Sequence, residues 1–258
     1  MRASPLEDQA GLDRLFFDLA SESRLGILRE LQTKGLRMQE IARKLDLTNT
    51  ETSRQLPRLA EALMIQRQSD GVYSVTNFGK LILEFFPAFE FIQKHREYFT
   101  THDYRKLPHP FISRLGEISK GELKTELAET VNRVEDMFNS SEEHVWVMTT
   151  QTVHTSASHS QAMTERLQRG VKYRALVHER LIESPLSQSL TGKNVEKRSL
   201  LEIPGTVVIT EKEACISLFL LDGKVDYSTF FGSDSTFMNW AKDLFNYFWG
   251  KGRQVYPL

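Results

Sequence analysis

The sequence predicts an α+β protein with a helical N-terminal part and a mixed α/β C-terminal part, and three observations lead to this fold class. Apolar residues recur at helical spacing through about the first sixty positions. The dipeptide Asp70-Gly71, between two alternating stretches, then indicates a β-hairpin. Beyond residue 119, a strand-helix-strand pattern and several closely spaced strands precede an aromatic helix, an order typical of a mixed α/β domain.

The N-terminal part is predicted to be a series of short helices followed by the hairpin. Ser21 is expected to cap a helix whose apolar stripe contains Leu25, Leu28 and Leu31. A third, shorter helix follows in MQEIARKLDL, and a fourth begins after Thr48. Helices in this order with a terminal hairpin predict a winged helix-turn-helix domain over residues 1–76.

The helix after Thr48 is the candidate for DNA contact. The run Thr48-Asn49-Thr50-Glu51 matches a capping box, in which the threonine hydroxyl accepts from the Glu51 N–H and the glutamate reaches back. One face of this helix is apolar, and the opposite face carries the short polar and forked basic side chains that base edges and phosphates require. The predicted DNA-binding residues are Thr48, Asn49, Thr50, Ser53, Arg54 and Arg58, with Arg67 from the hairpin.

Pro57 interrupts the pattern of this helix. Proline lacks the N–H that would bond to the Ser53 carbonyl, and it crowds that carbonyl. Two interpretations stay open: the helix continues through Pro57 with a local kink, or one helix ends near Gln55 and another starts at Pro57. In either case the first turns, which read bases in helix-turn-helix proteins, lie before the proline.

Residues 77–118 are predicted to form a helical linker that also makes a dimer interface. Pro87 should break or kink this segment, and the prolines of LPHPF suggest a domain boundary near residue 110. The segment has more apolar residues than one face of a lone connector needs, which favours a homodimer or docking on the second domain. These apolar residues are Phe78, Leu81, Ile82, Phe85, Phe86, Phe89, Phe91, Ile92 and Phe99.

Residues 119–258 are predicted to form an α/β domain that senses an effector. The stretch from Ser119 through GELKTELAETVNRVEDMFNSS is expected to be helical. Open α/β sheets bind ligands beyond the carboxyl ends of their strands, and Gln151 and His178 end two predicted strands. Ser233 and Asp234 precede the last helix, whose free N–H groups suit an anion. The simpler alternative is that Ser233 or Asp234 only caps that helix.

Composition excludes several classes of protein. A formal net charge of -1 at pH 7 is not that of a protein that coats nucleic acid, so any DNA contact must be local. Between Arg37 and Arg67 the basic residues exceed the acidic ones by two. No apolar run is long enough to span a bilayer, and the polar start of the chain resembles no targeting signal, so a cytoplasmic protein is expected. Cys215 is the only cysteine and should lie in a buried strand.

The sequence predicts no cofactor and no metal site. His95, His102 and His109 are seven residues apart, but Pro108 breaks the helical register that would align them as metal ligands. No glycine-rich phosphate loop, serine-histidine-acid order or paired carboxylates indicate catalysis. None of the histidines is followed two places on by lysine, the pair that a phospholipase-D-type hydrolase requires.

Several strings resemble a known family of regulators. FFDLASESRLGILREL, IARKLDL, TETSRQLPRL and YSVTNFG resemble the ArsR-type winged-helix superfamily. With HREYFTTHDYRKLPHPFISRLGE and DYSTFFGSDSTF, the whole chain is similar to archaeal regulators of the methanogenesis-regulator type. This resemblance implies a homodimeric transcription regulator that binds double-stranded DNA, with a second domain of non-catalytic, phospholipase-D-like layout that senses an effector. LRMQEIARKL lacks the cysteine pair of metal-sensing relatives.

The predicted function is therefore a DNA-binding transcriptional regulator that is not an enzyme and whose C-terminal domain responds to a small molecule or a partner. Two alternatives stay open. One is a winged-helix module that contacts other proteins, which the small local charge excess allows. The other is a phospholipase-D-like phosphodiesterase, against which the missing histidine-lysine pair counts.

Overall fold

The computed structural model describes residues 11–151, 157–184 and 191–255, and it divides into two compact units. The first unit is Met1–Phe86 and the second is Pro87–Leu258. Each has a hydrophobic core of its own. The segment 77–118, predicted as a linker, falls partly in each unit.

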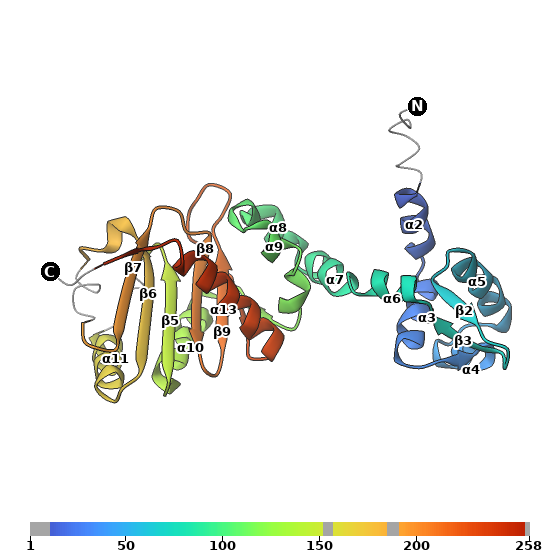
Figure 1. Ribbon diagram of the computed structural model, residues 1–258, viewed down its shortest axis with the longest axis horizontal. Helices are drawn as coiled ribbons and strands as arrows, with labels where there is room; N and C mark the ends of the chain where they lie inside the picture. The colour runs from blue at the N-terminus through green and yellow to red at the C-terminus, as the bar shows by residue number, and fades with distance from the viewer. Residues whose placement is uncertain (1–10, 152–156, 185–190, 256–258) are drawn as a thin grey trace, which may run out of the picture. The chain divides into compact units, whose positions relative to one another are not determined.

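The first unit is the predicted winged helix-turn-helix, in which five described helices accompany a small antiparallel sheet (Figure 1). Strand β1, too short to be predicted, pairs with the wing strand β3, and the sheet order is β1-β3-β2. Its elements are α2 (Leu12–Leu19), α3 (Glu22–Thr33), β1 (Leu36–Arg37), α4 (Met38–Lys44), α5 (Asn49–Glu61), β2 (Ile65–Arg67), β3 (Val72–Val75) and α6 (Asn77–Leu83).

The predicted caps and turn lie where the sequence places them. Ser21 accepts from the Arg24 N–H, and Thr48 Oγ1 accepts from the Glu51 N–H at 3.1 Å. Gly71 adopts a φ of 86°, the left-handed conformation that glycine tolerates best in a hairpin turn. The reciprocal half of the capping box is wrong, because the Glu51 carboxylate instead accepts from Ser23 Oγ at 2.6 Å and thereby ties α5 to α3.

A buried arginine joins three helices of the first unit. Arg24 on α3 is only 5% exposed. Its guanidinium donates to Gln55 Oε1 of α5 at 3.2 Å, to the Phe17 carbonyl of α2 at 2.7 Å and to the Asp18 carbonyl. These acceptors lie near the apolar core that α3, α4 and α5 share with the wing. The arginine therefore fixes α5 relative to α2 and α3 by hydrogen bonds as well as by packing.

The second unit is built on an eight-stranded mixed sheet of order β11-β7-β6-β5-β8-β9-β10-β4 (Figure 1). Strands β5, β6 and β7 are parallel, and the other pairs are antiparallel. The strands are β4 (Glu122–Lys124), β5 (His144–Thr149), β6 (Lys172–His178), β7 (Val195–Leu200), β8 (Gly205–Thr210), β9 (Ala214–Leu218), β10 (Thr229–Gly232) and β11 (Arg253–Gln254).

The second unit differs from the prediction in two places. The stretch after Ser119, expected to be helical throughout, first forms β4, because Glu122–Lys124 pair with β10. LPHPF does not mark a boundary between the units, since Leu107 and Phe111 are buried in the core of the second unit. The helices are α7 (Phe86–Lys94), α8 (Arg96–Thr101), α9 (His109–Ile112), α10 (Leu127–Ser140), α11 (Ala157–Gln168) and α13 (Ser235–Trp249).

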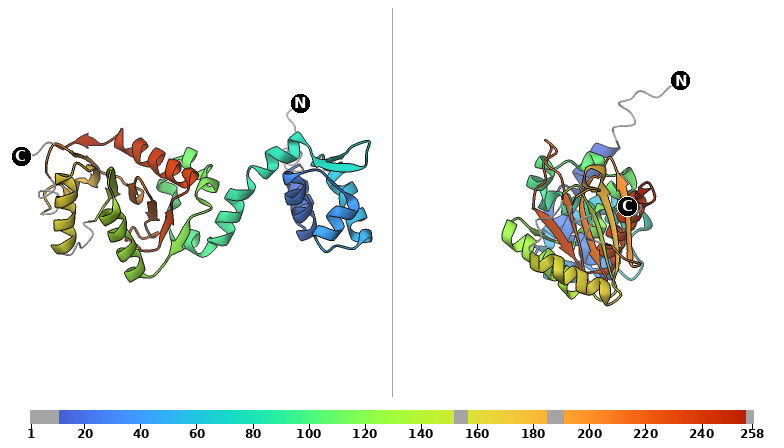
Figure 2. Two further views of the ribbon diagram at one scale, coloured as in Figure 1. Left: turned by 90° about the horizontal axis from the view of Figure 1, so that it is seen from below. Right: turned by 90° about the vertical axis from the view of Figure 1, so that its left-hand side faces the viewer.

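Helices cover both faces of this sheet. Helices α10 and α11 lie on one side, and α13 lies on the other (Figure 2). Adjacent strand residues accordingly face different cores: Val208 packs with the α10 and α11 residues, and Val207 and Ile209 pack with those of α13. Cys215 lies in β9 as predicted, and burial raises the pKa of its thiol to about 12. It is therefore a packing residue rather than a reactive thiol.

Arg24→Ala is expected to lower the free energy of unfolding of the first unit by about 2–4 kcal/mol, because it leaves buried acceptors without donors. Urea denaturation followed by circular dichroism measures the change. The matched control is Arg43→Ala, since Arg43 is exposed on α4 and its loss should change stability by less than about 0.5 kcal/mol. Equal effects of the two substitutions would contradict the role given to Arg24.

Candidate nucleic-acid interface and ligand pocket

Helix α5 has one buried face and one exposed face, as the sequence predicts. Thr52, Gln55, Leu56 and Leu59 are buried against the first unit. All seven residues predicted to contact DNA have exposed side chains. They are Thr48, Asn49, Thr50, Ser53, Arg54, Arg58 and Arg67.

The arginines of this surface are not neutralised by acidic neighbours. Among the described residues, neither Arg54 nor Arg58 forms an ion pair or a side-chain hydrogen bond. Arg67 lies on the wing strand β2, and its guanidinium carbon is 5.8 Å from the centre of the Tyr73 ring, a cation–π contact that leaves its donors available. Helix α5 and the wing together therefore present cationic, hydrogen-bonding groups to the solvent.

Pro57 lies within a continuous helix. Helix α5 runs from Asn49 to Glu61 and contains the proline, so the alternative of two helices separated near Gln55 is wrong. The Pro57 ring is exposed, on the side away from the core. Residues of the first two turns, from Thr48 to Arg54, precede the proline, and Arg58 directly follows it.

A pocket in the second unit lies between α10 and the end of the sheet where β5 finishes. Every second residue of the central strands faces α10, and at this end the facing residues change from apolar to hydroxyl-bearing. The hydroxyls form a row across four neighbouring strands, with Thr149 on β5, Thr206 on β8, Ser217 on β9 and Thr229 on β10. The oxygens of Thr149 and Thr206 are 3.5 Å apart. We call these four residues the hydroxyl row.

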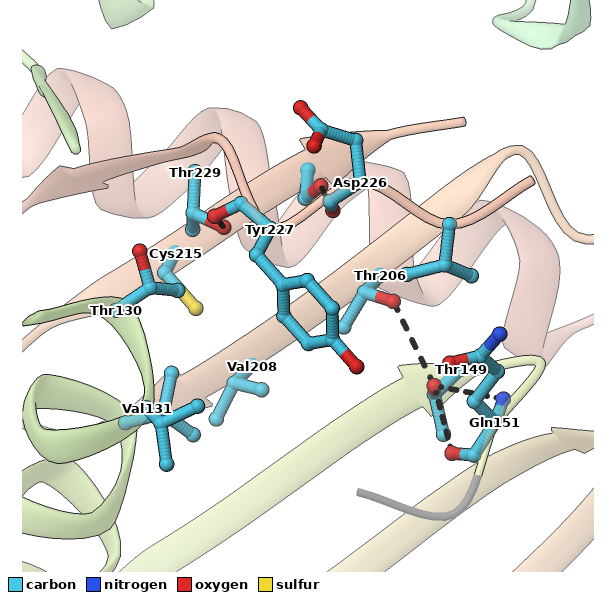
Figure 3. Close-up of a pocket in the computed structure, with 13 residues that line it drawn as sticks. Thr130, Val131, Thr149, Gln151, Thr206, Val208, Cys215, Asp226, Tyr227 and Thr229 are labelled. Atoms are coloured by element: carbon cyan, nitrogen blue, oxygen red, sulfur yellow. Dashed lines mark hydrogen bonds between the residues drawn. The ribbon is translucent and has the colours of Figure 1, made fainter. Parts of the chain in front are cut away.

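The hydroxyl row holds the rim of the pocket. Ser217 Oγ donates to the Asp226 carbonyl at 2.9 Å, and Thr229 Oγ1 donates to the Tyr227 carbonyl at 2.9 Å. Thr149 Oγ1 donates to the Gln151 carbonyl and accepts from the Gln151 N–H. In Figure 3 the Tyr227 ring lies across the pocket, with its hydroxyl pointing toward Thr149 and Thr206. The segment 226–227 therefore lies over the pocket and is fixed to the sheet beneath it.

Asp226 links this rim to helix α8. Its Oδ2 lies 3.0 Å from His102 Nε2 and accepts from the Ser228 N–H at 3.2 Å. Burial alone would raise the pKa of Asp226, but hydrogen bonds from Ser228 and His102 outweigh burial and lower this pKa below its usual value. The His102 ring stacks on Tyr98 with 3.6 Å between ring centres, and the Tyr98 hydroxyl accepts from the Leu218 N–H. A continuous chain of contacts thus joins the pocket rim, α8 and β9.

The four predicted ligand-binding residues are not brought together. Gln151 lines the pocket described above, whereas His178 lines a second pocket with Lys106 and Arg180. Asp234 caps α13, accepting from the Thr236 N–H at 3.1 Å, as the simpler interpretation held. Ser233 is exposed and lines neither of these pockets. The hydroxyl row was not predicted, although threonine and serine at alternating strand positions were a usable signal.

The three histidines considered as metal ligands have separate surroundings. His95 packs edge-on against Phe91 and Phe230, and His102 bonds to Asp226. His109 begins the short helix α9. Over the described part of the chain, no three histidine, cysteine or carboxylate side chains gather as a metal site would require.

Two family models match the chain. The HVO_A0261 N-terminal domain matches residues 12–97, and the middle domain of the methanogenesis regulatory protein FilR1 matches residues 127–251. The resemblance to regulators of the methanogenesis type is confirmed. The first match covers the winged helix with α6 and α7, and the second covers the region from α10 to the end of α13. A search of curated proteins finds no match.

Solved structures with a similar course of the chain include an archaeal chromatin protein, a phospholipase D family member and NucT from Helicobacter pylori. TrmBL2, the chromatin protein, is 14% identical, with a TM-score of 0.44 over 90% of this chain and 93% of its own. Nuc from Salmonella typhimurium, a phospholipase D family member, and NucT from Helicobacter pylori are each 14% identical over 53% of this chain and 99% of theirs. Their TM-scores are 0.40 and 0.43, too low to assign a shared function.

No described helix is both long and apolar enough to cross a membrane.

Asp226→Asn is expected to destabilise the second unit by about 1 kcal/mol at pH 7, because it removes the charge that its hydrogen bonds favour. Since the folded pKa is lowered, the stabilisation is present above the unfolded pKa, near 3.8, and is lost as pH falls through the folded pKa. The difference between the two proteins should therefore shrink below about pH 4. Urea denaturation at several pH values measures it, and a difference that grows toward acid would contradict the assignment.

Proposed function

We propose that the chain is a DNA-binding transcription regulator that reads operator DNA through α5 and the wing. The observation that carries this proposal is the exposed face of α5, which carries the predicted contact residues from Thr48 to Arg58 and where Arg54 and Arg58 have no described acidic partner. The match to the middle domain of the regulatory protein FilR1 supports the same function. Buried Arg24 and partly buried Ser23 on α3 hydrogen-bond to Gln55 and Glu51 and so hold α5 in place, as a helix that must enter a groove requires.

Within α5 we infer a division of roles. Thr48 to Arg54 precede Pro57 and occupy the first turns, which contact base edges when such a helix enters the major groove. Arg58 follows the proline and is better placed for a phosphate. Arg67 on the wing supplies a second phosphate contact. The free N–H groups at the start of the helix add to the attraction for phosphate.

Combined replacement of Arg54 and Arg58 by alanine is expected to weaken binding to DNA fragments recovered from a genomic pull-down by at least about tenfold, because two cationic contacts are lost. Gel shifts at fixed salt measure the change. Arg96→Ala removes an exposed arginine from α8 in the other unit and serves as the matched control. Unchanged binding by the double variant, with an intact circular dichroism spectrum, would contradict the proposed interface.

We further propose that the regulator is a homodimer. The apolar residues of the segment after the wing differ in how deeply they are buried. Phe91 is buried in the core of the second unit, and Phe99 packs against that core. Five others are 39–58% exposed: Phe78 and Leu81 on α6, Phe85 between α6 and α7, and Phe89 and Ile92 on α7. A second copy of the chain would cover these exposed apolar side chains.

Replacing both Leu81 and Phe85 by glutamate is expected to convert a dimer into a monomer at micromolar concentration, because burying two carboxylates without partners is costly. Sedimentation velocity measures the mass of both proteins. Leu127→Glu is the matched control, since Leu127 is similarly exposed but lies on α10. A monomeric unmutated chain would contradict the homodimer.

The second unit is proposed to respond to a small molecule, and the pocket beneath Tyr227 supports this role. The competing function is a winged-helix module for protein contacts, which the local excess of only two positive charges favours. The two proposals differ in whether duplex DNA is bound at all. A phosphodiesterase would need a cationic phosphate site. No lysine, arginine or histidine is among the described residues that line the pocket of the hydroxyl row, whereas Lys106, His178 and Arg180 line the second pocket.

A further inference from the structure

The pocket of the hydroxyl row contains a polar group without a partner. Thr130 on α10 lines the pocket and is 5% exposed, and its Oγ1 has no hydrogen-bond partner among the described residues. A buried hydroxyl left without a partner costs free energy that a ligand can recover. Its place opposite the hydroxyl row directs that ligand to the space between α10 and the sheet (Figure 3).

The donors and acceptors that remain free define which ligand groups the hydroxyl row can bind. A hydroxyl has one proton to donate and two lone pairs to accept with. Thr149, Ser217 and Thr229 already donate their protons to backbone carbonyls of the rim. They can meet a ligand only as acceptors, whereas the unpaired Thr130 hydroxyl can donate. The pocket therefore suits a group that both donates and accepts, such as an alcohol or a primary amide.

The charges described around the pocket disfavour an ionised ligand. None of the described lining residues is basic, so a carboxylate or phosphate would lose its hydration without a counter-charge from them. Asp226 is the one acidic residue in the part of the lining that the structure describes, and it is engaged by His102 and the Ser228 N–H. In Figure 3 its carboxylate points away from the Tyr227 ring and Thr149. A cation inside the pocket would accordingly lack a facing carboxylate.

The volume of the cavity and its aliphatic walls limit the nonpolar part of the ligand. The cavity measures about 70 Å³, and a cavity of about 150 Å³ holds benzene. It thus accepts a short group or one end of a longer molecule that emerges beside Tyr227. Val131 and Val134 of α10, Val208 of β8 and Val225 of the rim line it with aliphatic carbon. The enclosed part of the ligand should be a short aliphatic chain next to its polar group.

We propose that the pocket between α10 and the hydroxyl row binds an uncharged small molecule through an alcohol or amide group carried on a short aliphatic chain. This inference rests on the proposed function only in calling the molecule an effector. Thr130 is its central hydrogen-bond partner. Binding at this place contacts the segment 226–227, which Asp226 joins to His102, the C-cap of α8.

A series of butyl compounds tests the chemical class. The full-length chain, labelled with ¹³C in its valine methyl groups, is titrated with butyramide, 1-butanol, sodium butyrate, butyl phosphate and butylamine at pH 7, and methyl spectra are recorded. Butyramide and 1-butanol should shift the signals of the four pocket valines. Both should bind at least about tenfold more tightly than butyrate, butyl phosphate and the butylammonium ion, because an ion must be desolvated without a partner.

Variants of Thr130 test the predicted contact. Thr130→Val keeps the shape of the side chain but removes its hydroxyl, and it should weaken butyramide binding by about three- to tenfold. Thr130→Ser keeps the hydroxyl and should restore the affinity. Thr33→Val, a change of the same kind at an exposed position of α3, should leave it unchanged. The ligand series is measured on the unmutated chain, so a variant that fails to fold does not remove the test.

Two results would overturn the proposal. One is binding of butyrate, butyl phosphate or butylammonium as tight as that of butyramide. The other is the absence of shifts in the pocket valines with every compound. Because no DNA is present, these results are separate from a failure of operator binding, which the gel shifts with Arg54 and Arg58 variants report.

Discussion

Burial of the central sheet on both faces is the constraint on which the second unit depends. Strands β5, β8, β9 and β10 each send alternate residues to the α13 core and to the α10 core, so a shift by one residue would exchange the two sets. The same alternation aligns the hydroxyl row at the end of the sheet. One face of these strands therefore serves both packing and the pocket. Val208 and Cys215 on this face supply the apolar residues for packing, and Thr206 and Ser217 on the same face supply hydroxyls to the pocket.

A comparable constraint organises the first unit. Arg24 is buried without an acidic partner among the described residues and is satisfied by oxygens of α2 and α5. The arginine and the Glu51–Ser23 hydrogen bond both join α5 to the rest of the unit, and among the described residues Arg54 and Arg58 on its exposed side form no ion pair or side-chain hydrogen bond. The buried face of α5 thus holds the helix in place, and the exposed face leaves the guanidinium groups of Arg54 and Arg58 available for contacts.

The sequence predicted most of the first unit because its signals are local. Thr48, Ser21 and Gly71 act on neighbouring backbone groups, so their caps and turn could be identified without tertiary information. Strand β4 was missed because its three residues become a strand only by pairing with β10, more than a hundred positions later. The pocket was only partly predicted for the same reason: Gln151 was found from its place after a strand, but Thr130 and Tyr227 meet through the fold.

The central claim is that α5 and the wing bind duplex DNA through phosphate contacts from a locally basic surface. It is tested most directly by measuring the affinity of the purified chain for recovered DNA fragments by fluorescence anisotropy over a range of salt concentrations. The account predicts that the logarithm of the association constant falls linearly with the logarithm of salt concentration, with a slope of about -0.9 for each phosphate contacted. No binding, or an affinity independent of salt, would contradict it.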